Sequence, residues 1–305
     1  MGKVAFLFPG QGAQYSGMGK SLSEASPAAA GIFRMVDSIR PGTSQQCIAG
    51  SDEELKETKI TQPCIWAVEM AAAAALNESG IHADMTAGFS LGELSALSYA
   101  GVVDISTCFG LVCQRGRLMQ EAAEAVETSM AAVVKLSNET VEEICARFEG
   151  VYPVNYNCPG QVTVAGLRSS MAEFSAAVKE AKGRALPLKV SGGFHSPFMG
   201  QASAAFGALL DSVEFAPPSI PLYSNLTGLP YGTDMKQLRQ KQICSPVRWE
   251  TIIRNMIDAG ADTFIEVGPG NVLQGLIGKI DKTVRVFGVS DAETLAKTVQ
   301  EVKTC

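Results

Sequence analysis

The pentapeptide Gly88-Phe89-Ser90-Leu91-Gly92 lies between a short apolar run, Met85-Thr86-Ala87, and a segment with apolar residues at helical spacing that ends at Gly101. Gly-x-Ser-x-Gly spacing is typical of a sharp turn from a strand into a helix, because the two glycines let neighbouring backbone pass close to the serine. The pattern predicts that Ser90 is a nucleophile. A surface or structural turn is the alternative interpretation of this pattern alone.

The composition indicates a globular protein. The chain has 305 residues, of which 46% are hydrophobic and 18% charged, and a formal net charge of −6. It can bury the core of one large domain, or of a large and a small one. The lack of a basic run argues against a nucleic-acid partner. No apolar run is long enough to span a membrane, and residues 1–10 contain too short an apolar segment for a signal peptide. We therefore expect a cytoplasmic protein with no membrane partner.

Cysteine and histidine usage bears on metal and disulfide sites. The eight cysteines form no Cys-x-x-Cys pair and lie in several apolar segments, so we expect reduced thiols that are mostly small core residues. His82 and His195 are the only histidines in the sequence, which weakens any metal-site interpretation. We expect no bound metal.

Short β-rich runs alternate with amphipathic helical stretches, a pattern typical of an α/β protein with a mainly parallel sheet. The strands that we expect are 4–8, 86–88, 222–224, 263–267 and 284–288. The helices that we expect are 60–79, 91–100, 105–125, 197–212, 247–259 and 272–280.

Residues 129–191 have a different order of elements. We expect strands at 130–134, 152–156, 161–165 and 185–190, and helices at 140–148 and 171–181. This β-α-β-β-α-β order predicts a small ferredoxin-like subdomain, inserted into a core made of residues 1–128 and 192–305. Ser90 precedes the insert and His195 follows it, so a cleft between the two bodies would hold the chemistry.

Ser90 needs a base, and the best-placed imidazole is that of His195, in a Gly-rich loop that enters a helix. Serine before histidine also matches the chain order of α/β hydrolases. A histidine that caps or packs the following helix is the alternative. His82 lies in a polar turn and is better interpreted as a surface residue.

A second Gly-rich turn, Phe8-Pro9-Gly10-Gln11-Gly12-Ala13-Gln14, follows the first expected strand. It could bring the backbone N–H of Gln11 to an oxyanion, together with the N–H of Leu91. The alternative is an ordinary tight turn. The missing Gly-Lys-Ser/Thr argues against a phosphate loop.

Two arginines lie on the expected helix 105–125. Arg115 is about 80° from the apolar face of that helix and Arg117 about 120°, so Arg115 is the better candidate for pointing inward. A partly buried guanidinium suits a substrate carboxylate. A solvated or structurally paired arginine is the alternative.

The serine motif belongs to a set of six short stretches along the chain. The complete set is Phe8–Gln14, Gly88–Glu93, Gln114–Gly116, Asn155–Gln161, Gly193–Ser196 and Glu266–Gly270. Together and in this order they resemble the malonyl-CoA:acyl-carrier-protein transacylases, the stand-alone acyltransferases of bacterial type II fatty acid synthesis. The resemblance covers nearly the whole chain.

The resemblance implies an α/β-hydrolase-like core with a ferredoxin-like insert, and a ping-pong transfer. Ser90, deprotonated by His195, would attack malonyl-CoA, and the N–H groups of Gln11 and Leu91 would hold the oxyanion. Arg115 would bind the malonyl carboxylate. The phosphopantetheine thiol of acyl carrier protein would then attack the malonyl-serine ester.

The resemblance also assigns a role to residues 242–249, in which the backbone carbonyl of Gln242 would orient His195. It implies no required cofactor beyond the CoA thioester substrate and the phosphopantetheine of the carrier protein. We expect a monomer. The enzyme alternatives are a trans-acting polyketide synthase acyltransferase and a serine thioesterase or esterase, and a binding module without catalysis is the third possibility.

The chain departs from the family at Phe89, where the family usually has histidine. Phe194 resembles the malonyl-selective members, since its bulk would crowd an α-methyl group. Four basic residues of the insert are candidates for docking the acidic carrier protein, with ordinary solvated charges as the alternative. They are Lys179, Lys182, Arg184 and Lys189.

Overall fold

Four strands pair in parallel in the order β2-β1-β7-β8, in a computed structural model that describes residues 2–188, 190 and 192–303. The strands are β1 (Lys3–Phe8), β2 (Met85–Gly88), β7 (Ala261–Val267) and β8 (Arg285–Val289). The central strands β1 and β7 are buried along nearly their whole length, as expected when both faces of a parallel sheet are covered. This confirms the predicted parallel sheet.

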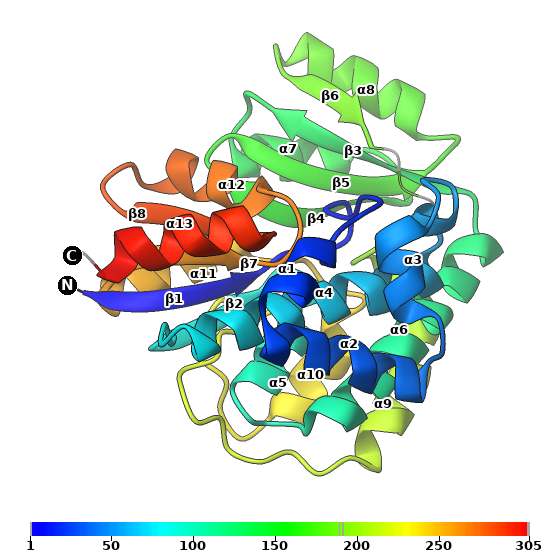
Figure 1. Cartoon of the computed structure of the whole chain (residues 1–305). Helices are drawn as coiled ribbons and strands as arrows, with labels where there is room; N and C mark the ends of the chain where they lie inside the picture. Colours follow the sequence, from blue (N-terminus) through cyan, green and yellow to red (C-terminus); the bar gives the residue numbers. More distant parts are fainter. Residues whose placement is uncertain (1, 189, 191, 304–305) are drawn as a thin grey trace.

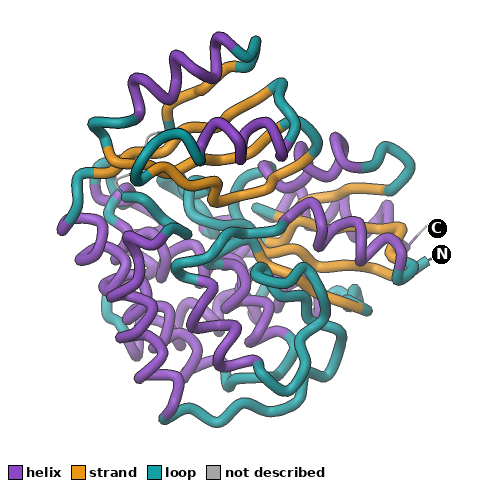
Figure 2. The backbone as a smooth tube through the Cα atoms, turned by 180° about the vertical axis from the view of Figure 1, so that it is seen from behind, coloured by secondary structure: helices purple, strands orange, loops and turns teal. Residues whose placement is uncertain are grey.

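Helices cover both faces of this sheet (Figures 1 and 2). In β1, Phe6 and Phe8 pack into one hydrophobic cluster with Trp66, while Leu7 packs into a second cluster with Trp249. This division follows the period-2 alternation of a strand. The α-helices of this part are α1 (Lys20–Ala25), α2 (Pro27–Ile39), α3 (Thr43–Ala49), α4 (Thr58–Glu78), α5 (Gly92–Tyr99), α6 (Ile105–Ala125), α9 (Gly200–Asp211), α10 (Met235–Gln242), α11 (Trp249–Asp258), α12 (Val272–Ile280) and α13 (Ala292–Lys303). Two short 3₁₀ helices are η1 (Glu54–Lys56) and η2 (Pro197–Met199).

None of the described helices combines the length and the apolar character needed to cross a membrane.

A second, antiparallel sheet has the strand order β4-β5-β3-β6 and forms a separate layer with two helices (Figure 1). Its elements are β3 (Thr128–Val134), α7 (Asn138–Cys145), β4 (Val151–Cys158), β5 (Gln161–Leu167), α8 (Met171–Glu180) and β6 (Arg184–Pro187). They enclose a hydrophobic cluster of their own that includes Val133, Val162 and Phe174. The predicted order of elements is confirmed, although the last strand ends at Pro187 rather than at residue 190. Lys189, one of the docking candidates, lies outside the described residues.

The two layers are joined by a pair of backbone hydrogen bonds. The N–H of Tyr156 donates to the carbonyl of Val247 over 2.9 Å, and the N–H of Val247 donates to that of Val154 over 2.8 Å. Strand β4 is therefore fixed to the segment that precedes α11.

The predicted strand 222–224 is wrong. Only isolated bridges occur there, Leu222 pairing with Thr86 and Tyr223 with Pro230. The chain reverses directly afterwards: the N–H of Ser224 donates to the Leu229 carbonyl, and Gly228 has a φ of 75°. The reversal leaves no length for a strand.

The predicted helices 105–125 and 272–280 have the observed bounds, whereas the predicted helix 197–212 is divided between η2 and α9. Among the described residues, five α-helices were not predicted: α1, α2, α3, α10 and α13. For α2 a start signal exists, because Ser26 accepts a hydrogen bond from the N–H of Ala29 and Pro27 occupies the first turn. Helix α10 is almost entirely polar and has no apolar stripe to reveal it.

The ends of β1 and β2 and the start of α5 touch through their backbones. A Cβ atom on Gly92 would lie 2.1 Å from the carbonyl oxygen of Phe8, and one on Gly88 would lie 1.8 Å from the carbonyl carbon of Gly92. The glycines of the serine motif are therefore required by close packing.

We expect Gly92→Ala to lower the free energy of unfolding by roughly 1–3 kcal/mol or more, because the methyl group must displace backbone rather than a flexible side chain. Gly110→Ala within α6 is the matched control, since its Cβ would meet nothing within 4 Å. The control should be stabilised by about 0.5–1 kcal/mol. Urea unfolding of both variants checks this, and equal midpoints would contradict it.

Candidate active site

Ser90 lies in the turn between β2 and α5 with a φ of 55°, a left-handed conformation that is rare for a residue with a side chain. The side chain of Asn225 fixes this turn through two hydrogen bonds. Its Oδ1 accepts a hydrogen bond from the Ser90 N–H over 2.7 Å, and its Nδ2 donates to the Gly88 carbonyl over 2.6 Å. One amide side chain thus holds both ends of the turn and leaves the serine hydroxyl free to face the cleft.

The hydroxyl of Ser90 lies 2.6 Å from Nε2 of His195. Nδ1 of the same ring lies 2.9 Å from the backbone carbonyl of Gln242. A carbonyl oxygen only accepts hydrogen bonds, so the proton of the neutral ring is on Nδ1 and Nε2 is the acceptor facing Ser90. The structure therefore connects Ser90, His195 and the carbonyl of Gln242 through two consecutive hydrogen bonds.

The environment of His195 keeps its ring neutral. Burial, followed by the positive charge of Arg115, lowers the pKa of His195 to about 3, against the ordinary 6.5. Hydrogen bonds to the backbone of Gln242 and Ser245 act in the opposite direction. At neutral pH the ring is a proton acceptor, which is the state that a general base requires.

Arg115 is fully buried on α6 and turns toward the nucleophile, as the helical spacing predicts. Its Nη1 donates to Oε1 of Gln62 over 2.9 Å, and its Nη2 lies 3.3 Å from the Ser90 hydroxyl and 3.2 Å from Oε1 of Gln242. Arg117, in contrast, is half exposed and pairs with Glu121.

All these partners of Arg115 are neutral, and within the described part of the chain Nε has no hydrogen-bond partner. Burial, followed by the charge of Arg239, lowers the pKa of Arg115, and Glu93 acts in the opposite direction. A guanidinium nevertheless keeps its proton at neutral pH. The site thus presents a buried cation beside the serine, an arrangement that suits an anionic group of a ligand.

A buried ion pair lies beneath the serine turn. Oε2 of Glu93 accepts a hydrogen bond from Arg239 over 2.9 Å, and both side chains are fully buried. Oε1 accepts from the Asn225 N–H over 2.7 Å and from the Tyr231 hydroxyl over 2.9 Å. Burial raises the pKa of Glu93, while the charge of Arg239 and these hydrogen bonds act to lower it. The carboxylate thus fixes the backbone of the residue that holds the turn.

Asn225, Gln62 and the Glu93–Arg239 pair also belong to the site, although they were not predicted from the sequence. For Asn225 a signal was present, since it follows an apolar run that ends beside β2, and ligand sites of open α/β sheets lie at the carboxyl ends of strands. Arg239 had none, because it lies in a polar stretch that resembles a solvated helix.

A cavity of about 90 Å³ opens in front of Ser90, and it adjoins a second one of about 230 Å³. The two share Gln11, Phe89, Asn155 and Leu188 in their walls. Leu91 lines the smaller cavity, so both backbone segments proposed for an oxyanion border the space beside Ser90. Because the walls come from both sheets, this is the cleft predicted between the two layers.

The two phenylalanines at which the sequence was compared with the family, Phe89 and Phe194, both line the cavity in front of Ser90. Phe89, in place of the usual histidine, contacts Trp249 edge to face with ring centroids 5.3 Å apart. Three docking candidates, Lys179, Lys182 and Arg184, are exposed near the end of α8 and on β6.

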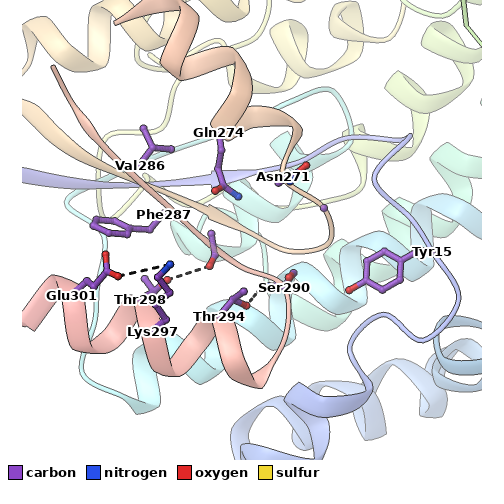
Figure 3. Close-up of a pocket in the computed structure, with 12 residues that line it drawn as sticks. Tyr15, Asn271, Gln274, Val286, Phe287, Ser290, Thr294, Lys297, Thr298 and Glu301 are labelled. Carbon is purple, nitrogen blue, oxygen red and sulfur yellow. Dashed lines mark hydrogen bonds and ion pairs between the residues drawn. The ribbon is translucent and has the colours of Figure 1, made fainter. Parts of the chain in front are cut away.

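Another cavity, of about 470 Å³, lies elsewhere, at the edge strand β8 between α12 and α13 (Figure 3). Tyr15, Gln274 and Lys297 are among its lining residues. None of the predicted site residues lines this cavity. The chemistry therefore belongs to the smaller cleft at Ser90.

Known proteins share both the sequence and the fold of this chain. A family model described as an acyl transferase domain matches residues 5–304. The malonyl CoA-acyl carrier protein transacylase of Bacillus subtilis strain 168 is 39% identical over 312 residues, which cover 99% of this chain and 98% of that protein. That of Haemophilus influenzae is 35% identical and covers 95% of this chain and 96% of its own.

Solved structures agree. The malonyl CoA-acyl carrier protein transacylase of Clostridium perfringens has a TM-score of 0.95 at 34% identity, covering 99% of this chain and 98% of that one. A malonyl-transacylase in complex with its type II PKS acyl-carrier protein has a TM-score of 0.94 at 33% identity, covering 98% and 99%. Since the similarity extends over nearly the full length of each chain, this chain belongs to the acyl transferase family, among the malonyl CoA-acyl carrier protein transacylases.

Proposed function

We propose that the protein transfers a malonyl group from malonyl-CoA to the phosphopantetheine thiol of an acyl carrier protein, through an ester on Ser90. This proposal rests on Arg115, which is fully buried and has only neutral hydrogen-bond partners among the described residues. Its Nη2 lies 3.3 Å from the hydroxyl oxygen of Ser90. A malonyl thioester has a free carboxylate at one end and a reactive carbonyl at the other. Binding the carboxylate at Arg115 places the carbonyl at Ser90.

In the first half of the reaction, Nε2 of His195 accepts the proton as the Ser90 oxygen attacks the thioester carbonyl. The N–H groups of Gln11 and Leu91 stabilise the resulting oxyanion. When the carbon–sulfur bond breaks, His195 returns the proton to the sulfur of CoA, which leaves as a thiol. The Gln242 carbonyl holds the ring in the required tautomer throughout.

In the second half, His195 accepts the proton of the carrier-protein thiol while the sulfur attacks the malonyl-serine ester. A carbon–sulfur bond forms, the carbon–oxygen bond breaks, and Ser90 regains its proton. Arg115 keeps the malonyl carboxylate bound between the two halves. None of these steps requires a cofactor.

The larger adjoining cavity suits the pantetheine arm that both thioesters carry. The Oδ1 atoms of Asn155 and Asn157 are buried there without a hydrogen-bond partner in the described structure. A pantetheine arm contains amide N–H groups, which can donate hydrogen bonds to these oxygens. We assign the mouth of this cavity to the approach of the carrier protein, and the exposed residues Lys179, Lys182 and Arg184 of the antiparallel layer to its docking.

The pathway has two candidates. Fatty acid synthesis is the first. Polyketide synthesis is the second, because one of the similar proteins was solved with its type II PKS acyl-carrier protein. The selectivity for malonyl over methylmalonyl groups, which we attribute to Phe194, is part of the same proposal. The cytoplasmic location, the monomeric state and the lack of a required cofactor stay predictions.

We also assign the finer fold. The antiparallel layer has the β-α-β-β-α-β order and a strand order of second, third, first and fourth, which supports a ferredoxin-like subdomain at 129–191. The turn at Ser90, at the end of a parallel strand, supports an α/β-hydrolase-like core made of 1–128 and 192–305.

Labelled malonyl-CoA tests the proposal. We expect the label to appear on Ser90 by mass spectrometry, and to move to holo acyl carrier protein when that protein is added. Ser90→Ala should abolish both, and Ser212→Ala, at an exposed serine, should change neither. Release of the label mainly as free malonate with the carrier present would identify a thioesterase instead.

Replacement of Arg115 tests the carboxylate site. We expect Arg115→Met to reduce transfer from malonyl-CoA by roughly 10- to 100-fold more than transfer from acetyl-CoA, because a hydrogen bond to a charged group contributes about 1.5–3 kcal/mol. Arg117→Met, at the half-exposed neighbour, is the matched control. Equal losses with the two substrates would show that Arg115 has only a structural role.

The pH dependence of Ser90 malonylation tests the state of His195. Because the pKa of His195 is lowered from 6.5 to about 3, the ring stays neutral as the pH falls through 6.5. We therefore expect the single-turnover rate to be nearly constant between about pH 5 and 8. A loss of half the rate near pH 6.5 would contradict a buried neutral base.

A further inference from the structure

We infer that Arg239 is a positioning residue, whose ion pair with Glu93 fixes helix α10 and its residue Gln242 against the serine turn. This inference rests on the proposed function. It assigns to the reaction a pair of residues that touch neither the substrate nor the reacting atoms.

The geometry connects the pair to the reacting groups at both ends. Glu93 lies three residues after Ser90, in the first turn of α5. Arg239 lies three residues before Gln242 on α10, so the two occupy adjacent positions on one helix. The 2.9 Å contact between Glu93 and Arg239 therefore joins the helix of the nucleophile to the helix that orients the base.

Gln242 makes four contacts that depend on the position of α10. Its carbonyl lies 2.9 Å from Nδ1 of His195, and its Nε2 donates to the Ser90 carbonyl over 2.9 Å and to Asn225 Oδ1 over 3.1 Å. Its Oε1 accepts from Arg115 over 3.2 Å. A small shift of α10 would therefore change the orientation of the base and of the cation together.

The pair is a poor choice for stability alone. Both side chains are fully buried, and Nε and Nη2 of Arg239 have no hydrogen-bond partner in the part of the chain that the structure describes. Apolar residues of similar volume are often as stable as a buried ion pair, or more so. Unpartnered buried N–H groups add a further cost. A positional role accounts for a pair that stability does not require.

The charge of Arg239 also acts on the site. It contributes to lowering the pKa of both Arg115 and His195. The charged groups that act on His195 are these two arginines, and both favour the neutral ring. Glu93, Arg115 and Arg239 together carry one negative and two positive charges. The excess positive charge favours an anionic group of the substrate.

The experiment measures single-turnover malonylation of Ser90 per folded molecule against pH, together with urea unfolding, in the full chain. Arg239→Met leaves Glu93 buried and unpaired, whereas Glu93→Gln combined with Arg239→Met removes both charges. We expect the double variant to be more stable than the single one, and both to lose roughly 10- to 100-fold in rate, since small misplacements of reacting groups cost this much. Their acid limbs should move to higher pH.

Arg254→Met combined with Glu250→Gln is the matched control, because it removes a more exposed Arg–Glu pair from α11. It should keep the wild-type rate and pH profile. A wild-type rate and acid limb in whichever neutral Arg239 variant folds would overturn the inference.

If neither neutral variant folds, Arg239→Lys decides through its rate. We expect a loss of at least about 3-fold, because a compact ammonium group on a flexible stem cannot hold Glu93 in the geometry that the planar guanidinium gives. The wild-type rate would overturn the inference. Failure of the wild-type protein to transfer malonyl groups would instead overturn the proposed function, so the two failures are distinguishable.

Discussion

The left-handed backbone of Ser90 is the constraint on which the rest of the site depends. A residue with a side chain adopts such a conformation at a cost, and it persists only when its surroundings fix it. Here Asn225 bonds both sides of the turn, Glu93 fixes Asn225, and Arg239 and Tyr231 complete the partners of Glu93. A buried hydrogen-bond network thus determines where one hydroxyl points.

Charge in the site is arranged around a neutral base. A cation beside a histidine opposes its protonation, and burial acts in the same direction, so both keep His195 neutral at neutral pH. In the proposed reaction the same arginine also binds the substrate carboxylate, so one cation has both effects. The absence of an acidic partner for the imidazole fits this arrangement: the Gln242 carbonyl orients the ring without adding charge.

The segment from Gln242 to Val247 connects the two layers to the chemistry. At one end its carbonyl orients His195, and at the other Val247 pairs with β4 next to Asn155, which lines the cleft. The position of the antiparallel layer is thus tied by backbone hydrogen bonds to the chain that holds the base. Cleft shape and base orientation are consequences of one short connection.

By itself, the sequence determined the parallel sheet, the order of elements in the insert, the serine turn and its histidine, because periodicity, glycine spacing and the scarcity of histidine are local or compositional signals. The inward turn of Arg115 was predictable from its helical position. Tertiary structure alone decided the roles of Gln62 and Arg239, whose sequence contexts are ordinary, and it alone decided that Asn225 holds the Ser90 turn. The contacts of Gln62 with Arg115, of Asn225 with Ser90 and of Arg239 with Glu93 span 53, 135 and 146 residues of the chain, and no local pattern records such contacts.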